Sequence, residues 1–166
     1  MEKKILLTLG ITTYNRVKFL ETAVNNYIKQ IIDNGLEEEV EIVISNDASP
    51  DDTYEYVNKV NNEHKFVRGF NHQKNIGVTQ NIEWTVNEAR GVYIQLCGDD
   101  DLMRDGAIAY FVKTIKDKGP NFIIVNTSNI HSLDEGNKKY NIVLENRLNI
   151  HKDIFMEDYQ KDYEVL

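Results

Sequence analysis

The fold is decided by the segment ILLTLGITTYNR (residues 5–16), in which a short apolar run gives way to polar residues. Residues 5–11 have the length and composition of a buried β-strand, and the polar residues 12–15 are expected to end it. From Val17 apolar residues recur every three or four positions, which predicts an amphipathic helix ending before Asn34. A strand followed directly by a helix is the first half of a βαβ unit.

The same alternation continues along the chain. Apolar, strand-like runs recur after each helical pattern, at residues 40–45, 66–70, 92–97 and 122–125. Helical patterns lie between them, at about residues 50–61, 78–90 and 105–118, and Ser49 and Asp105 are expected to cap the first and last of these. The pattern predicts an α/β fold, with a mostly parallel sheet covered by helices on both faces in three layers. Beyond residue 128 the signal weakens to a short strand at 142–144 and a helix at 151–163.

Composition restricts the partners. The chain has 166 residues and a formal net charge of −8, which argues against nucleic acid or an anionic membrane surface as a partner held by charge. Cys97 is the single cysteine, so neither an internal disulfide nor a multi-cysteine zinc site can form. The apolar run at the N-terminus is too short and too polar for a signal or a membrane span. We therefore expect a soluble, cytoplasmic chain.

Three adjacent carboxylates, Asp99, Asp100 and Asp101, directly follow the strand expected at 92–97. Adjacent carboxylates repel one another, and a cation or a set of hydrogen-bond donors is the usual reason to keep them together. Their hard oxygen ligands suit Mg²⁺ or Mn²⁺, which often take substrate phosphates as further ligands. Gly98 lets the backbone approach a ligand closely. The sequence indicates a metal and diphosphate site, with a solvated acidic turn as the alternative.

Two other strand ends carry residues suited to a nucleotide. Tyr14 can stack on a base, and Asp47 can accept a hydrogen bond from a base N–H, which suits uracil or thymine. Backbone N–H groups of the turn Asn75–Gly77 could face phosphate. The alternatives are a ring packed over the sheet edge for Tyr14, a cap for Asp47 and an ordinary turn at 75–77. Because ligands bind beyond the carboxyl ends of parallel strands, these residues are expected to converge.

Taken together, these blocks resemble the family 2 glycosyltransferases of the GT-A fold. The resemblance covers roughly residues 5–125 and is carried by four blocks in the family's order: ITTYNR (11–16), IVISNDAS (42–49), NIG (75–77) with Asn81, and GVYIQLCGDDD (91–101). It implies inverting transfer of a sugar from a nucleotide-diphosphate donor to an acceptor hydroxyl. The implied donor-binding residues are Thr13, Tyr14, Asn15, Asp47, Asn75, Gly77, Gln80 and Asp99, and the implied ligands of Mg²⁺ or Mn²⁺ are Asp99, Asp100 and Asp101.

The resemblance also implies a layout for the chain. Residues 1–128 would form the nucleotide-sugar-binding core, with UDP or dTDP favoured, and residues 129–166 would begin an acceptor-side region of the same domain. The acceptor would be a saccharide or lipid-linked saccharide at the inner membrane face. A catalytic base would come from a later region, so we expect this chain to be the donor-binding part of a longer enzyme. Asp158, in the one Glu-Asp pair after the aspartates, is the candidate base, with a charged terminal helix as its alternative.

Two other functions are compatible with such a sheet. A nucleotidyltransferase would need a glycine-rich basic loop after the first strand, and residues 12–18 contain no glycine. A non-catalytic module could keep the fold for nucleotide or sugar binding, which fold alone cannot decide.

Overall fold

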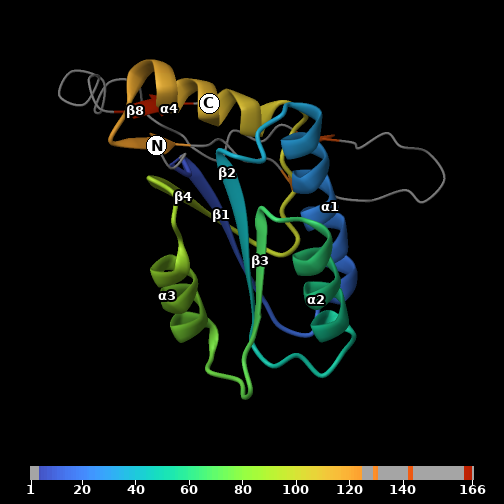
Figure 1. Cartoon of the computed structure of the whole chain (residues 1–166). Coiled ribbons are helices and arrows are strands. Elements are labelled where there is room, and N and C mark those ends of the chain that lie inside the picture. The colour runs from blue at the N-terminus through green and yellow to red at the C-terminus, as the bar shows by residue number, and fades with distance from the viewer. Residues whose placement is uncertain (1–3, 125–128, 131–141, 144–162, 166) are drawn as a thin grey trace. The chain divides into compact units, whose positions relative to one another are not determined.

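The computed structural model describes residues 4–124, 129–130, 142–143 and 163–165 (Figure 1). The chain forms two compact units, residues 1–116 and residues 117–166. The first unit holds the main sheet and every residue of the predicted site except Asp158, which lies outside the described residues.

The first unit is built on a parallel sheet, as predicted, but the sheet has four strands, and the fifth predicted strand, at 122–125, pairs outside it. The strand order of the sheet is β3-β2-β1-β4, with β1 (Leu7–Thr13) and β2 (Val40–Asn46) in the centre and β3 (Val67–Asn71) and β4 (Tyr93–Cys97) at the edges. Thr13 pairs with Asn46 and Ile11 pairs with Cys97, so β1, β2 and β4 end at the same edge of the sheet. The segments that follow these strands therefore begin side by side.

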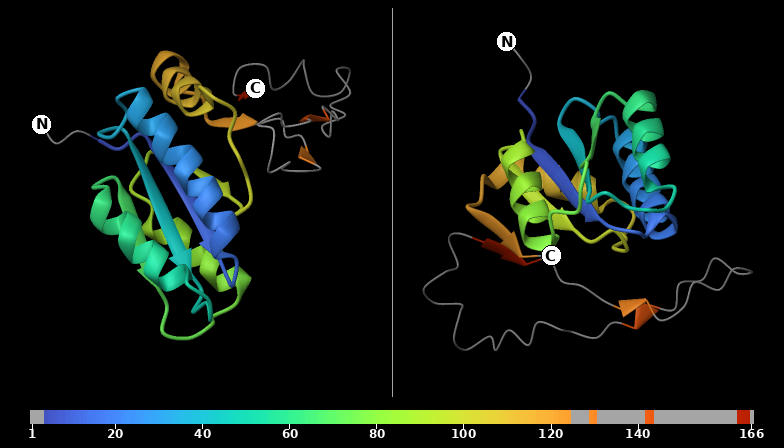
Figure 2. Two further views of the ribbon diagram at one scale, coloured as in Figure 1. Left: turned by 90° about the vertical axis from the view of Figure 1, so that its right-hand side faces the viewer. Right: turned by 90° about the horizontal axis from the view of Figure 1, so that it is seen from below.

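Helices cover both faces of this sheet, which confirms the three-layer prediction. The helices α1 (Val17–Asp33) and α2 (Thr53–Glu63) lie on one face, and α3 (Val78–Glu88) lies on the other (Figure 1; Figure 2). The fourth helix, α4 (Ala107–Lys118), buries an apolar stripe of Ile108, Phe111, Val112 and Ile115. Among the described residues, no helix combines the length and apolar character needed to cross a bilayer.

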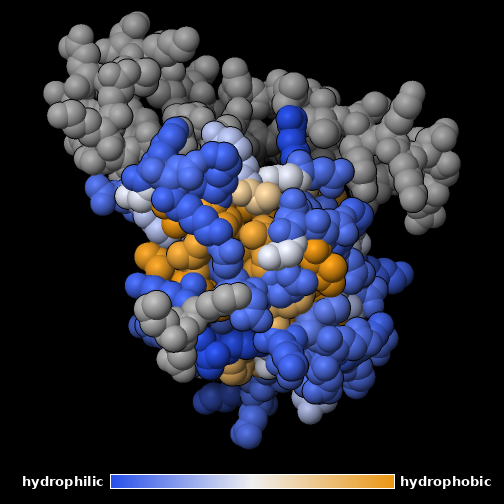
Figure 3. All heavy atoms as spheres, turned by 45° about the horizontal axis from the view of Figure 1, so that its top comes forward, coloured by the Kyte–Doolittle hydropathy of each residue, from blue (hydrophilic) through white to orange (hydrophobic). Residues whose placement is uncertain are grey.

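The core follows the apolar pattern of the two central strands. Every residue of β2 is buried, and Leu9 and Ile11 of β1 are fully buried, because helices cover both faces of these strands. The edge strand β4 differs, since Ile94 and Leu96 are 36% and 42% exposed. Figure 3 shows one face of the molecule, on which hydrophobic residues reach the surface between hydrophilic ones.

Several predicted boundaries are wrong. The first strand continues through Thr13 because β-branched threonines suit a strand, and Thr13 still pairs with β2. Ser49 does not cap α2, which begins at Thr53 after Asp52. Asp105 does not directly precede α4, because Gly106, with a φ of +85°, intervenes before Ala107.

The described residues of the second unit form two small strand pairs. In the first, β5 (Phe122–Ile124) pairs in parallel with β8 (Tyr163–Val165), and in the other β6 (Asn129–Ile130) pairs antiparallel with β7 (Ile142–Val143). The strands predicted at 122–125 and 142–144 are thus confirmed over their described residues. The helix predicted at 151–163 is wrong at Tyr163, which lies in β8, and its other residues lie outside the described part of the chain.

A buried carboxylate ties the sheet together away from the carboxyl edge. Glu41 of β2 is 3% exposed, and its Oε1 accepts hydrogen bonds from Thr8 Oγ1 at 2.8 Å and from the Arg90 backbone N–H at 2.7 Å. Its Oε2 pairs with Arg68 of β3 at 3.3 Å, and Arg68 also pairs with Glu88 of α3 at 2.9 Å. One side chain thus links three strands and the segment that leads into the fourth.

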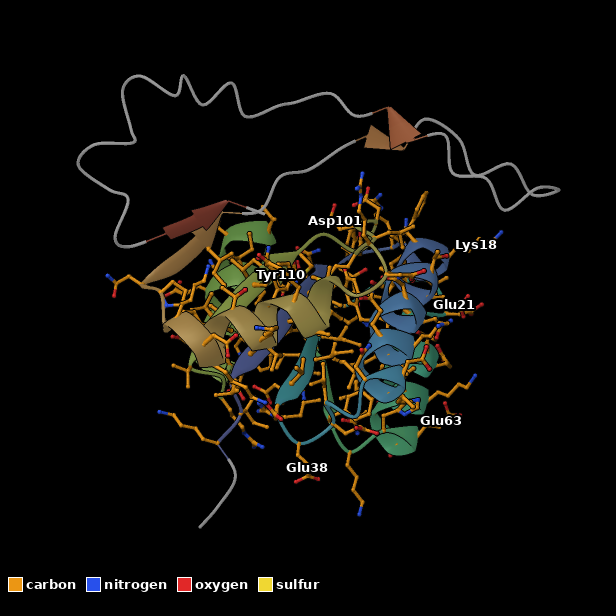
Figure 4. All side chains as sticks on the ribbon, turned by 90° about the horizontal axis from the view of Figure 1, so that it is seen from above. Lys18, Glu21, Glu38, Glu63, Asp101 and Tyr110 are labelled. Carbon is orange, nitrogen blue, oxygen red and sulfur yellow. The ribbon has the colours of Figure 1, made fainter. Side chains whose placement is uncertain are left out.

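Replacing Glu41 should therefore destabilise the fold strongly. We expect Glu41→Ala to lower the free energy of unfolding by about 3–5 kcal/mol, because Arg68 would lose a buried partner. The control is Glu38→Ala, whose side chain extends away from the fold (Figure 4) and whose loss should change stability by at most about 0.5 kcal/mol. Urea unfolding of both variants measures the difference, and equal stabilities would contradict this account.

Candidate functional site

Three loops meet at the carboxyl edge of the sheet. Hydrogen bonds join the loop after β1 to the loop after β2, from Asn15 N to Ser49 Oγ at 2.8 Å and from Val17 N to Asp51 Oδ2 at 3.0 Å. Thr13 Oγ1 donates to Asp99 Oδ2 at 2.8 Å, which joins the end of β1 to the loop after β4. The tyrosine-bearing turn and the acidic triplet thus border one region, as the sequence predicted.

The carboxylate of Asp99 is the buried member of the triplet. Asp99 is 5% exposed, and it is held by Thr13, itself buried, and by Arg16 Nη1 at 3.1 Å. Burial raises the pKa of Asp99, although the hydrogen bond from Thr13 and the charge of Arg16 oppose the rise. The side chains of Asp99 and Thr13 are thus fixed inside the edge of the sheet. Little of either side chain is exposed for direct contact with a ligand.

Arg16 bridges two members of the triplet. Besides its contact with Asp99, its Nη2 lies 2.7 Å from Asp100 Oδ2, and its guanidinium carbon lies 4.7 Å from the centre of the Phe19 ring. The hydrogen bond to Asp100 is the main cause of the raised pKa of Arg16. Sequence reasoning gave Arg16 no role, although it is the cation nearest to the end of the first strand.

The third carboxylate turns back on its own loop. Asp101 Oδ2 accepts a hydrogen bond from Gly98 N at 2.7 Å, and the backbone oxygen of Asp101 accepts one from the buried Tyr27 hydroxyl at 2.9 Å. A Cβ on Gly98 would lie 2.9 Å from Asp100 Oδ1 and 3.1 Å from Asp101 Oδ2. A side chain at position 98 would therefore push these two carboxylates aside, and an oxygen of each lies on the same side of Gly98.

This arrangement fits a divalent cation that shares its ligands with a substrate. Mg²⁺ and similar ions are commonly held by one or two carboxylates, with water and substrate phosphates completing the coordination. Asp100 is exposed, and its oxygen lies near that of Asp101, so the two supply such a pair. Within the described ranges, no group of three or more acidic, histidine or cysteine side chains is placed to hold a metal. A cation here would need further ligands besides these two carboxylates, as Mg²⁺ sites that use water and substrate phosphates do.

Asp47 lies at the carboxyl edge of the sheet, but its carboxylate oxygens already accept hydrogen bonds from the chain. It is 3% exposed, and its oxygens accept hydrogen bonds from the backbone N–H groups of Ile76 at 2.6 Å and Gly77 at 3.0 Å. Asn75 Oδ1 also accepts from Gly77 N at 3.0 Å. The amide of Gly77, which was expected to face phosphate, is thus directed at Asp47. The carboxylate holds the turn that leads into α3.

The remaining predicted residues lie on the surface near these groups. Tyr14 is 49% exposed in the loop after β1, and Asn15 beside it is exposed with a φ of +55°. Gln80 is exposed in the first turn of α3. The structure thus gathers Thr13, Asp99 and Asp100 in one cluster and Asp47, Asn75 and Gly77 in another.

Ser49, expected as a helix cap, and Asp51, expected within the helix, instead shape the loop after β2. Ser49 Oγ donates to Asn46 Oδ1 at 2.5 Å while it accepts from Asn15 N. Asp51 accepts from Val17 N and from Thr53, and these hydrogen bonds lower its pKa against the opposing effect of burial. Polar residues clustered after a strand were the available signal, but the sequence alone could not show which loop they contact.

Comparison with known proteins shows the family of this chain. The model of the family described as glycosyl transferase family 2 matches residues 8–164. The chain belongs to this family. Among curated relatives, the glycosyltransferase GlyG of Streptococcus pneumoniae serotype 4 is 24% identical over 129 residues, which are 78% of this chain and 41% of the relative. The match thus covers less than half the length of that relative.

Solved structures share the fold. S. aureus TarS 1–349 in complex with UDP-GlcNAc superposes with a TM-score of 0.69 and 18% identity, over 78% of this chain and 36% of that one. The mannosyltransferase PcManGT from Pyrobaculum calidifontis, in complex with GDP-Man and Mn²⁺, gives a TM-score of 0.63 and 19% identity, over 76% of this chain and 36% of that one. These likenesses confirm the predicted GT-A architecture of the family.

Removing the Asp47 carboxylate should loosen the 75–77 turn. We expect Asp47→Ala to lower the free energy of unfolding by about 2 kcal/mol, because two backbone N–H groups lose a charged acceptor. Asp52→Ala, the same change at an exposed position later in the same loop, whose side chain makes no capping hydrogen bond to α2, should shift it by at most about 0.5 kcal/mol. Chemical denaturation measures both. Equal losses would show that the two amide contacts contribute nothing specific.

Proposed function

We propose that this chain binds a nucleotide-diphosphate sugar and serves metal-dependent, inverting transfer of the sugar to an acceptor hydroxyl. The observation that carries the proposal is the hydrogen bond between Thr13 and Asp99, which brings Tyr14 and the acidic loop to one edge of the sheet. An aromatic ring and a set of carboxylates at one site suit the base and the diphosphate of the same ligand.

The base would stack on the exposed Tyr14, with Thr13 and Asn15 in the same loop beside it. Asp47 would accept a base N–H only if the turn at 75–77 releases one of its two amides. Asn75, Gly77 and Gln80 would then border the donor from the start of α3. TarS was solved with UDP and with UDP-GlcNAc, which supports UDP or dTDP, whereas the mannosyltransferase was solved with GDP-Man. Identifying the base therefore requires a direct test.

The metal would be Mg²⁺ or Mn²⁺, held by the carboxylates of Asp100 and Asp101, with the buried Asp99 as their neighbour in the same loop. Bound there, it would stabilise the charge that develops on the leaving diphosphate. The Mn²⁺ in the mannosyltransferase complex supports this choice. The protein's own contribution is to hold Asp99 in place through Thr13 and to keep the loop tight through the contact of Asp101 with Gly98.

The acceptor half of the reaction rests on the family. Inversion requires the acceptor hydroxyl to attack the anomeric carbon from the side opposite the diphosphate, while a general base removes its proton. Asp158 remains our candidate for that base. Residues 1–128 would form the donor-binding core and residues 129–166 the start of the acceptor side, within one domain of a longer enzyme. The acceptor would be a saccharide or lipid-linked saccharide at the inner face of the membrane, reached from the cytoplasm.

A nucleotide panel tests donor binding. The chain is heated with UDP, dTDP, GDP, CDP or ADP, each with and without Mn²⁺, and its unfolding temperature is recorded. One nucleotide should stabilise the fold in the presence of Mn²⁺, and at 100 times its Kd binding adds about 2.7 kcal/mol. If no nucleotide shifts the transition with or without the metal, the chain is a module of the same fold that does not bind the donor.

The metal assignment predicts which carboxylate matters. Asp100→Ala should abolish the Mn²⁺-dependent part of the nucleotide shift while leaving the unfolding temperature of the unliganded chain almost unchanged, because Asp100 is exposed. Asp105→Ala, an equal charge change farther along the same loop, should retain the whole shift. Retained metal dependence in the Asp100 variant would exclude this residue as a ligand.

A further inference from the structure

We propose that Arg16 is an exchangeable counter-ion of the acidic loop. It occupies Asp100 while no divalent cation is bound, and it turns to the diphosphate of the donor when the cation takes that carboxylate. The proposal deepens the function proposed above and rests on it, because it assumes that a metal and a diphosphate meet at this loop.

The Arg16 guanidinium lies beside the carboxylates that would receive the divalent cation and the diphosphate. Its two terminal nitrogens lie 3.1 Å from Asp99 Oδ1 and 2.7 Å from Asp100 Oδ2, so one cation balances two adjacent carboxylates. The same Asp100 carboxylate offers its other oxygen, Oδ1, to the point beside Gly98 that Asp101 also approaches. A divalent cation bound by Asp100 Oδ1 would share the carboxylate with Arg16 and weaken its hold on the guanidinium.

The contact is built to exchange at small cost. The side chains of Arg16 and Asp100 are 42% and 49% exposed, and ion pairs between exposed groups contribute little to stability. Asp99 differs, since its side chain is 6% exposed and is held by Thr13. Release of Arg16 would therefore leave Asp99 anchored to the end of β1 while Asp100 changes partner.

The Arg16 side chain also keeps a favourable contact after its release from Asp100. Its guanidinium already lies over the half-exposed Phe19 ring, so it has a second favourable contact that does not depend on the carboxylates. Guanidinium presents planar, paired donors that match phosphate oxygens. A diphosphate bound to a cation at Asp100 would lie within reach of these donors, because Asp100 and Arg16 are in direct contact.

The exchange predicts two effects of opposite sign. In Arg16→Ala, Mn²⁺ alone should bind about three- to five-fold more tightly, because a competing cation has been removed. UDP in the presence of saturating Mn²⁺ should bind at least about ten-fold more weakly, because a charged phosphate contact has been lost. Mn²⁺ binding is followed by the electron paramagnetic resonance signal of the free ion, and UDP binding by calorimetry. A purely structural role for Arg16 would weaken both.

Two further variants keep the test decisive. Arg16→Lys retains the charge, so UDP affinity should fall less than in Arg16→Ala, and this variant replaces it if the alanine variant does not fold. Lys18→Ala removes an equal charge two residues away, where the side chain points away from the acidic loop (Figure 4), and both affinities should stay within two-fold of wild type by our estimate.

The outcomes separate this inference from the proposed function. If the wild-type chain binds neither Mn²⁺ nor UDP, the proposed function itself fails. If the wild type binds both, and Arg16→Ala weakens both or changes neither, the proposed function stands and the exchange by Arg16 is overturned. Tighter Mn²⁺ binding together with weaker UDP binding supports the exchange.

Discussion

The hydrogen bond from Thr13 to Asp99 is the constraint on which the site depends. It joins residues 86 positions apart, and both partners are buried, so neither can turn to water without loss. It forms because β1 lies between β2 and β4 in a parallel sheet, where strands that are far apart in sequence end together. Without it, the acidic loop would have no fixed position relative to the turn that carries Tyr14.

Exposure separates three buried carboxylates that hold the fold from Asp100, the candidate metal ligand. Glu41, Asp47 and Asp99 are each at most 5% exposed, and each is matched by donors from other elements of the unit. Asp100 is exposed and contacts a flexible side chain. Buried carboxylates need such partners because the loss of hydration is otherwise not compensated. Exposure, more than residue type, therefore separates the candidate ligand from the structural carboxylates.

The fold could be predicted from the sequence because its signals are local. The change of period at Val17 marked the first helix, and the continuous apolar run of β2 correctly indicated a strand covered on both faces. The position of the acidic triplet after a strand placed it at the carboxyl edge. The partners of individual side chains were not local. Ser49 fitted the pattern of a helix cap, yet its hydroxyl contacts Asn15 and Asn46 across the loops.

Asp47 and Arg16 show why the candidate site could be located but not described from sequence. Each has the charge expected at a nucleotide site, yet each is matched by a partner within the chain, Asp47 by two backbone amides and Arg16 by two carboxylates. A donor would therefore exchange these contacts instead of adding to them. Since exchange of equivalent hydrogen bonds yields little net free energy, donor affinity should depend on base stacking and on the cation, which frees Arg16 to contact the diphosphate. Base stacking would act on Tyr14 and the cation on Asp100, and both side chains are exposed.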